Sequence, residues 1–117
     1  MARVRWGVLS TASIGRLMVE AARAADHAEF VAVASRDAAR ARAFADELGL
    51  GLSFGSYEEL LASEAVDAVY VALPVSMHAE WTVRSLEAGK HVLCEKPLAL
   101  RAEDAERCFA AARTAGV

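Results

Sequence analysis

The segment His91-Val92-Leu93-Cys94-Glu95-Lys96-Pro97 indicates the fold class of this chain. Its first four residues are a short apolar stretch typical of a β-strand, and a carboxylate, an ammonium and a proline follow directly. In open α/β sheets, the carboxyl ends of buried strands border the crevice where ligands bind. The segment is therefore interpreted as a buried strand that ends at a binding site. The alternative is a solvated loop with two ordinary surface charges.

Apolar stretches and helical patterns alternate along the rest of the sequence. We expect strands over residues 4–9, 30–34, 52–54, 66–73 and 91–94, and helices over residues 14–25, 38–48, 57–62, 77–88 and 102–115. Nearly continuous apolar strands are typical of a parallel sheet that is covered on both faces. Right-handed crossovers then give the strand order 3-2-1-4-5. The sequence therefore predicts an α/β fold, a Rossmann-like, doubly wound parallel sheet.

Several helices carry start and stop signals. Asp37 can cap the helix that ends before Gly49, and Ser56 opens a capping box with Glu59. The first helix is expected to bury one apolar face, formed by Ile14, Leu17, Met18, Ala21 and Ala25. Isolated aromatic residues on apolar segments are usually core residues, which applies here to Trp6, Tyr70 and Trp81.

The composition is typical of one globular domain. The chain has 117 residues, of which 56% are hydrophobic and 25% are charged. Its net charge of -3 and the lack of a basic block argue against a nucleic-acid partner. Because no apolar run reaches about 18 residues, no membrane partner is expected. We expect a cytoplasmic protein without a metal site, with Cys94 and Cys108 as reduced thiols; a disulfide is the alternative.

The turn after the first strand lies where a dinucleotide fold binds a pyrophosphate. The usual fingerprint is G-x-G-x-x-G, and the aligned residues here are Ser10-Thr11-Ala12-Ser13-Ile14-Gly15. Gly15 lets the helix pack closely on the strand, and Ala12 lets a phosphate approach the N–H groups of the helix N-terminus. Hydroxyl donors come from Ser10, Thr11 and Ser13. We expect residues 10–14, Ile14 included, to contact a cofactor; the alternative is an ordinary turn capped by serine.

The end of the second strand indicates which cofactor is bound. An acidic residue about 20 positions after the fingerprint would bind the ribose 2′-hydroxyl of NAD, whereas an arginine accommodates the 2′-phosphate of NADP. Ser35 and Arg36 occupy this position, and Asp37 is better explained as a helix cap. The planar guanidinium of Arg36 can pair with a phosphate. The sequence therefore favours NADP over NAD, and the alternative for Arg36 is a solvated surface residue.

The loop after the fourth strand is expected to cross the cofactor face. Leu73 and Pro74 end the strand, because proline stops sheet pairing. His78 follows in the first turn of the next helix, where its ring could contact the ribose or the nicotinamide. The alternative for His78 is a capping or supporting role, and His27 and His91 are expected to be structural.

Three segments together resemble a known family: "RWGVLSTASIG", "VAVASRD" and "VDAVYVALPVSMHAEWTVRSLEAGKHVLCEKPLAL". They look like the N-terminal half of the glucose-fructose oxidoreductase and inositol dehydrogenase family (Gfo/Idh/MocA), and the resemblance covers essentially all 117 residues. It is most specific at Glu95-Lys96-Pro97. The resemblance implies that Lys96 is a catalytic residue that contacts the substrate hydroxyl and the nicotinamide ribose, positioned by Glu95 and Pro97. The tight turn is compatible with a cis Lys96–Pro97 bond.

The resemblance also implies a function. We expect residues 1–117 to be the NADP-binding domain of an oxidoreductase that transfers a hydride between the nicotinamide and a carbinol of a sugar, cyclitol or diol, with NAD as the other cofactor. Family members continue into a second α/β domain, so we expect the sheet to stop before a sixth strand. The alternative is a non-catalytic NADP(H)-binding or sensing module that pairs with another chain.

The family pattern also has departures here, at Ser10 and Ala12 in place of glycine and at Arg101 in place of a capping serine. We further expect a homo-oligomer. Its contacts would involve the apolar border of the fifth strand and the surface near Pro74, Met77 and Pro97.

Overall fold

Five parallel strands form the centre of the molecule. The computed structural model describes residues 2–117. The strands are β1 (Val4–Leu9), β2 (Ala28–Ala34), β3 (Leu52–Phe54), β4 (Ala68–Val71) and β5 (His91–Cys94). Their order in the sheet is β3-β2-β1-β4-β5, with every neighbouring pair parallel. The predicted α/β fold and strand order are confirmed, although β2 starts two residues earlier and β4 is shorter than expected.

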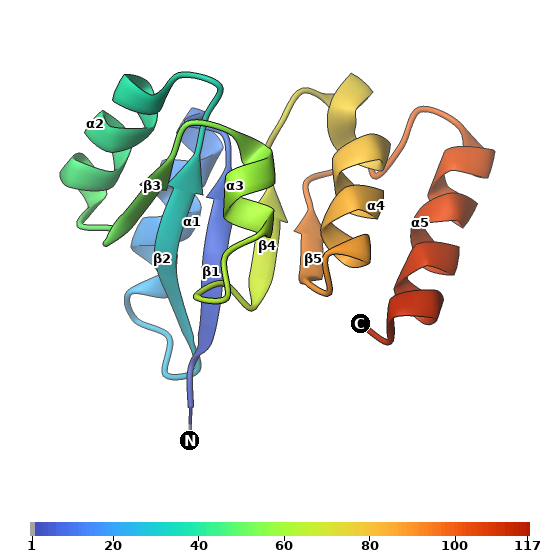
Figure 1. Ribbon diagram of the computed structural model, residues 1–117, viewed down its shortest axis with the longest axis horizontal. Coiled ribbons are helices and arrows are strands. Elements are labelled where there is room, and N and C mark those ends of the chain that lie inside the picture. The colour runs from blue at the N-terminus through green and yellow to red at the C-terminus, as the bar shows by residue number, and fades with distance from the viewer. Residues whose placement is uncertain (1) are drawn as a thin grey trace.

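Helices cover both faces of this sheet (Figure 1). They are α1 (Ser13–Ala22), α2 (Ala38–Leu48), α3 (Tyr57–Leu61), α4 (His78–Glu87) and α5 (Ala102–Ala115), with a 3-10 turn at Val75–Met77. Successive strand residues point to opposite faces, so Val8 packs with α1 and α2 while Leu9 packs with α3 and α4. Both residues are fully buried, and each such side chain contributes about 1.5–3 kcal/mol to stability.

The predicted buried face of the first helix is wrong. Ile14 and Leu17 are 41% and 67% exposed, whereas Gly15 and Val19 are buried against the sheet. A Cβ atom built at Gly15 would lie 3.3 Å from Cγ2 of Val8, so the missing side chain allows this close approach. The helix also ends at Ala22 instead of residue 25. Apolar residues lie on two adjacent stripes of the α1 surface. The stripe that contains Gly15 and Val19 packs against the sheet, because Gly15 has no side chain to keep the helix away.

The predicted capping signals are confirmed. The carboxylate of Asp37 accepts a hydrogen bond from the Arg40 N–H (3.1 Å), and Gly49 ends α2 with a φ of 73°. The Ser56 hydroxyl accepts from the Glu59 N–H at the start of α3 (3.2 Å). The two side-chain caps bond free N–H groups of the first turns, so they define where α2 and α3 begin. The carboxyl ends of the strands lie at one edge of the sheet because all neighbouring strands are parallel.

Two cationic side chains, those of Arg5 and Lys90, are hydrogen-bonded to protein groups at the amino edge of the sheet, where the strands begin. The Arg5 guanidinium donates to both Asp67 carboxylate oxygens (2.8 and 3.0 Å). The Lys90 ammonium is buried and donates to the carbonyls of Ser63 and Val66, at 2.7 Å each. Desolvation is the main reason that the pKa of Lys90 is lowered, and the Arg5 hydrogen bond lowers the pKa of Asp67 to about 2.

Both cysteines are free thiols, as expected. Helices long and apolar enough to cross a membrane do not occur within residues 2–117.

Candidate functional site

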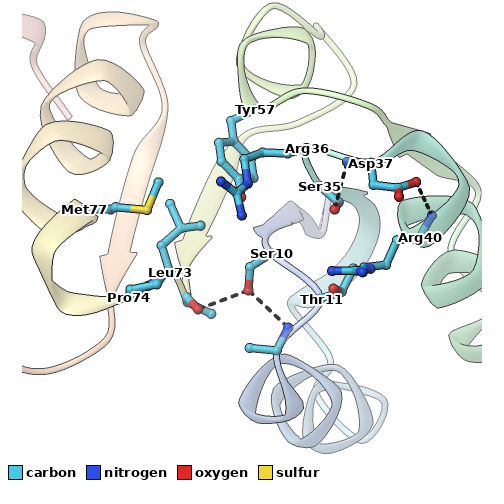
Figure 2. Close-up of a pocket in the computed structure, with 12 residues that line it drawn as sticks. Ser10, Thr11, Ser35, Arg36, Asp37, Arg40, Tyr57, Leu73, Pro74 and Met77 are labelled. Carbon is cyan, nitrogen blue, oxygen red and sulfur yellow. Dashed lines mark hydrogen bonds between the residues drawn. The ribbon is translucent and has the colours of Figure 1, made fainter.

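A cavity of about 680 Å³ lies at the carboxyl edge of the sheet (Figure 2). Its walls come from the turn after β1, the turn after β2 and the end of β4, which meet here because the strands are parallel. Seven of the predicted cofactor-binding residues line it: Ser10, Thr11, Ala12, Ser35, Arg36, Leu73 and Pro74. The structure therefore brings three separate sequence segments together around one space.

The turn after β1 adopts an unusual backbone conformation at Ser10. Its φ of 111° lies in the region that favours glycine, which is the residue of the usual fingerprint at this position. The Ser10 hydroxyl donates to the Ala72 carbonyl (3.0 Å) and accepts from the Ala12 N–H (3.1 Å). These two bonds stabilise a conformation that a serine rarely adopts. The Ser10 hydroxyl proton is thus hydrogen-bonded within the protein, which differs from the expected donation by Ser10 to the cofactor.

The N-terminus of α1 faces the same cavity through its first residues. Ala12 is the N-cap and lines the cavity, and the helix has neither a side-chain cap nor an acidic residue in its first turn. The first N–H groups of a helix lack intrahelical partners, and the helix dipole adds positive potential there. Such an end fits a phosphate group. Ser13 and Ile14 belong to this turn but do not line the cavity with their side chains.

The turn after β2 and the first turn of α2 each supply one arginine to the cavity. Ser35 is buried and its hydroxyl accepts from the Asp37 N–H (3.2 Å), which shapes the turn. Arg36 and Arg40 line the cavity, and Arg40 extends from the first turn of α2 in the direction of Thr11 in this view (Figure 2). The Asp37 carboxylate is occupied as the cap of α2. This wall of the cavity is therefore cationic.

The predicted catalytic lysine lies in a neighbouring turn and does not line the cavity. Lys96 is exposed, and its peptide bond to Pro97 is cis, as the sequence analysis allowed. The Lys96 N–H donates to Glu95 Oε1 (3.3 Å), and Glu95 Oε2 accepts from the Tyr70 hydroxyl (2.5 Å). The Tyr70 hydrogen bond is the main cause that lowers the pKa of Glu95. Burial raises the pKa of Tyr70, so Tyr70 is the donor and Glu95 the carboxylate.

His78 connects this turn to the cavity wall. The side chain is 2% exposed, with Nδ1 2.7 Å from the Pro97 carbonyl oxygen and Nε2 2.7 Å from the Leu73 carbonyl oxygen. Both ring nitrogens therefore face protein atoms, and neither is turned toward a ligand. The geometry favours the supporting role of His78 over a direct contact with a cofactor.

Sequence reasoning missed the site role of five residues of this region. Arg40 stands in the first turn of α2, where the helix dipole disfavours a cation, and the acidic residue at this end, Asp37, is the N-cap and forms no ion pair with Arg40 among the described residues. Such an unfavourable placement is a signal for an anionic ligand. Tyr70 was interpreted as a core residue only, yet a buried tyrosine hydroxyl needs a polar partner, which here is Glu95. Tyr57, Ala72 and Met77 also line the cavity without an earlier signal.

Within the described residues 2–117, no three His, Cys, Asp or Glu side chains are grouped so that they could bind a metal ion.

The model of one protein family matches residues 4–117 of the chain. It is described as the GFO_IDH_MocA oxidoreductase family with an NAD-binding Rossmann fold. The match includes both cavity arginines and the Glu95-Lys96-Pro97 turn.

Individual relatives agree with the family match. A D-xylose 1-dehydrogenase (NADP(+)) from Haloferax volcanii is 48% identical over 113 residues, which are 96% of this chain and 34% of that protein. A 3-ketoreductase from Actinomadura kijaniata, solved with NADP and TDP-benzene, superposes with a TM-score of 0.93 at 45% identity, covering 98% of this chain and 35% of that one. The WlbA dehydrogenase from Bordetella pertussis, solved with NADH and UDP-GlcNAcA, gives 0.89 at 31% identity, with coverages of 98% and 35%. The chain thus spans about a third of the length of these relatives.

Proposed function

The chain belongs to the Gfo/Idh/MocA oxidoreductase family, whose matched domain has an NAD-binding Rossmann fold, and from this premise we propose that it is the NADP-binding domain of a sugar oxidoreductase. The observation that carries the proposal is the cavity at the carboxyl edge of the sheet. The uncapped N-terminus of α1 and the guanidinium groups of Arg36 and Arg40 border the same space. One end of this space suits a pyrophosphate and the other a further phosphate.

The residues of the cavity fit a dinucleotide. Gly15 is buried against Val8, which brings α1 close to β1, and the N–H groups of Ser13 and Ile14 are available for the pyrophosphate, whereas the Ala12 N–H donates to the Ser10 hydroxyl. Ser35, Arg36 and Arg40 are assigned to the ribose 2′-phosphate. An acidic side chain that would bind the 2′-hydroxyl of NAD is already used elsewhere, because Asp37 caps α2. The relatives solved with NADP and with NADH show that the fold accepts both cofactors, and the arginines of this chain support NADP.

Lys96 is proposed to act on the substrate. When bound, the nicotinamide supplies the hydride chemistry. The Lys96 ammonium is exposed, and its backbone is fixed by Glu95. An ammonium at this point can donate a hydrogen bond to the substrate oxygen, which gains or loses negative charge as the carbon is reduced or oxidised. Glu95 and Pro97 are assigned to the position of Lys96, and Leu73 and Pro74 to the wall on which the cofactor rests.

The substrate class follows from the relatives and stays a proposal. One relative is a D-xylose 1-dehydrogenase, and a solved relative, a 3-ketoreductase, carries the nucleotide-linked ligand TDP-benzene. We assign to the whole protein a sugar, cyclitol or diol, whose carbinol is oxidised or whose keto form is reduced. The relatives are about three times as long as this chain, so we place the substrate pocket and the remaining acid and base groups outside residues 1–117.

Self-association is a further part of the proposal. Strand β5 lies at an edge of the sheet, and its Leu93 side chain is 46% exposed. An apolar edge strand offers unpaired backbone groups to a second chain. Light scattering over a concentration series tests this, and a mass that stays monomeric at every concentration contradicts it.

Calorimetric titration of NADPH and NADH into the purified protein tests the cofactor assignment. We expect NADPH to bind more tightly, and Ser35→Asp to reverse the preference because a carboxylate would face the 2′-phosphate. The new carboxylate can still accept from the Asp37 N–H, so the turn is preserved. Equal affinities, or tighter binding of NADH by the wild-type protein, would contradict the proposal.

A further inference from the structure

His78 is the first residue of α4 and lies between two backbone segments of the site. Its Nε2 atom contacts the carbonyl of Leu73, which lines the cavity, and its Nδ1 atom contacts the carbonyl of Pro97, which directly follows Lys96. The two distances are 2.7 Å each, and the side chain is almost completely buried. One imidazole thus joins the cavity wall to the turn that carries the lysine.

Each contact of the His78 ring depends on which ring nitrogen carries a proton. A carbonyl oxygen only accepts hydrogen bonds, so a ring nitrogen must carry a proton to bind one. The neutral ring has a single N–H and binds one of the two carbonyls, whereas the doubly protonated ring binds both. The connection to Pro97 therefore requires a proton on Nδ1, and the connection to Leu73 requires a proton on Nε2.

The backbone on the other side of Lys96 is already fixed. The Glu95 N–H donates to the Val71 carbonyl (3.0 Å), and the Glu95 carboxylate accepts from both the Lys96 N–H and the Tyr70 hydroxyl. These contacts orient the turn up to the backbone nitrogen of Lys96. After this point the turn runs toward solvent, and the His78 contact with the Pro97 carbonyl is its next attachment to the core.

We propose that His78 is a positioning residue for Lys96: it fixes the Lys96–Pro97 turn relative to the wall of the cofactor cavity. This role rests on the proposed function, in which Lys96 acts on the substrate. His78 does so through the backbone, without touching cofactor or substrate. Because a displacement of about 1 Å at a reacting group can cost about 100-fold in rate, losing this attachment lowers kcat.

Two substitutions separate the two contacts of the ring. The amide nitrogen of asparagine can take the place of Nδ1, and that of glutamine can take the place of Nε2. His78→Asn therefore keeps a donor for Pro97, and His78→Gln keeps a donor for Leu73. In the protein at its full natural length, we expect His78→Gln to lower kcat about 30-fold with little change in NADPH affinity. His78→Asn should keep kcat within about threefold and weaken NADPH binding instead.

Ser85→Ala is the matched control. Ser85 is also buried in α4, and its hydroxyl bonds only within the helix, to the Trp81 carbonyl (2.6 Å). We expect this variant to keep both kcat and NADPH affinity, whatever its effect on the melting temperature. Equal losses of kcat in His78→Asn and His78→Gln that follow their melting temperatures would overturn the positioning role.

Lys96→Met in the same assay distinguishes the two proposals. If Lys96→Met lowers kcat and His78→Gln does not, the positioning role falls and the proposed function stands. If Lys96→Met keeps the wild-type kcat, both fall. Should the His78 variants not fold, the ring itself gives the answer: nitrogen-15 NMR of the wild-type chain must show a proton on Nδ1. An unprotonated Nδ1 cannot bind the Pro97 carbonyl and would overturn the inference.

Discussion

The two edges of the sheet bear cationic side chains in opposite situations. At the amino edge, Arg5 is paired with Asp67, and Lys90 donates to two carbonyl oxygens. At the carboxyl edge, Arg36, Arg40 and Lys96 take part in no ion pair found within the described residues 2–117. The same kinds of side chain thus complete the scaffold at one edge and stay available at the other.

The cationic side chains of the two edges are expected to have different roles: those at the amino edge stabilise the fold, and those at the carboxyl edge bind a ligand. A cation whose donors are used by the protein contributes to folding, and its removal leaves buried acceptors without partners. A cation without a protein partner adds little to stability, and it can bind an anionic ligand without breaking any internal contact. We therefore expect substitutions at the two edges to affect different measurements.

The largest effect is expected at Lys96. Lys96→Met in the full-length protein should lower kcat by about 100- to 1,000-fold, because the donor to the substrate oxygen is lost. The affinity for NADPH and the melting temperature should change little, since Lys96 is exposed. Steady-state kinetics, calorimetry and thermal unfolding measure the three quantities. A loss confined to NADPH affinity would move Lys96 from catalysis to binding.

Lys90→Met should show the reverse behaviour. It leaves the Val66 carbonyl without the Lys90 donor and the Ser63 carbonyl with only the longer contact from the Val66 N–H (3.5 Å), which costs about 2–3 kcal/mol of unfolding free energy. Chemical denaturation measures this loss, and NADPH affinity should stay at the wild-type value at temperatures where the variant is folded. An unchanged free energy of unfolding would mean that the Lys90 hydrogen bonds do not stabilise the amino edge of the sheet.

Arg40→Ala tests the cationic wall with a smaller effect. Loss of one charged hydrogen bond to the 2′-phosphate should weaken NADPH binding about tenfold and leave NADH binding unchanged. Arg42→Ala is the control, because Arg42 is exposed on the same helix and pairs with Asp46 (3.6 Å). Equal effects of the two substitutions on NADPH binding would remove Arg40 from the site.

The smallest effect concerns pH and the Arg5–Asp67 pair. The Arg5 hydrogen bond lowers the pKa of Asp67 from 3.8 to about 2. The folded protein thus favours the charged form, and the resulting stabilisation is complete above pH 3.8 and is lost as the pH falls through about 2. Because Asp67 is partly exposed, solvent screening limits the contribution to about 1 kcal/mol.

Denaturation of wild type and Asp67→Asn at pH 6 and pH 2 measures this contribution. The stability difference between the two proteins should shrink by about 1 kcal/mol at the lower pH. A stability difference that does not change with pH would show that the negative charge of Asp67 does not contribute to stability.

The sheet could be predicted because its strands are apolar and alternate with helices, two of which, α2 and α3, begin at side-chain caps. The caps at Asp37 and Ser56 use contacts three residues apart, so the sequence alone contains them. The buried face of α1 could not be predicted, because two neighbouring stripes are equally apolar and only the approach of Gly15 to Val8 selects one.

The site was predicted less completely for a similar reason. The turns after β1 and β2 follow spacing rules that a sequence shows directly, and the structure places both at the cavity. Contacts between distant residues do not follow such rules: Tyr70 meets Glu95 across 25 positions, and His78 meets Pro97 across 19. Those contacts depend on how β4, β5 and α4 pack, which only the structure gives.

The most direct test of the account compares two small probes of the cavity. Calorimetry of the chain with adenosine 2′,5′-bisphosphate and with adenosine 5′-monophosphate isolates the 2′-phosphate from the rest of the cofactor. If Arg36 and Arg40 at the carboxyl edge bind this phosphate, the bisphosphate should bind at least about tenfold more tightly. Equal affinities of the two probes, or tighter binding of the monophosphate, would contradict the account.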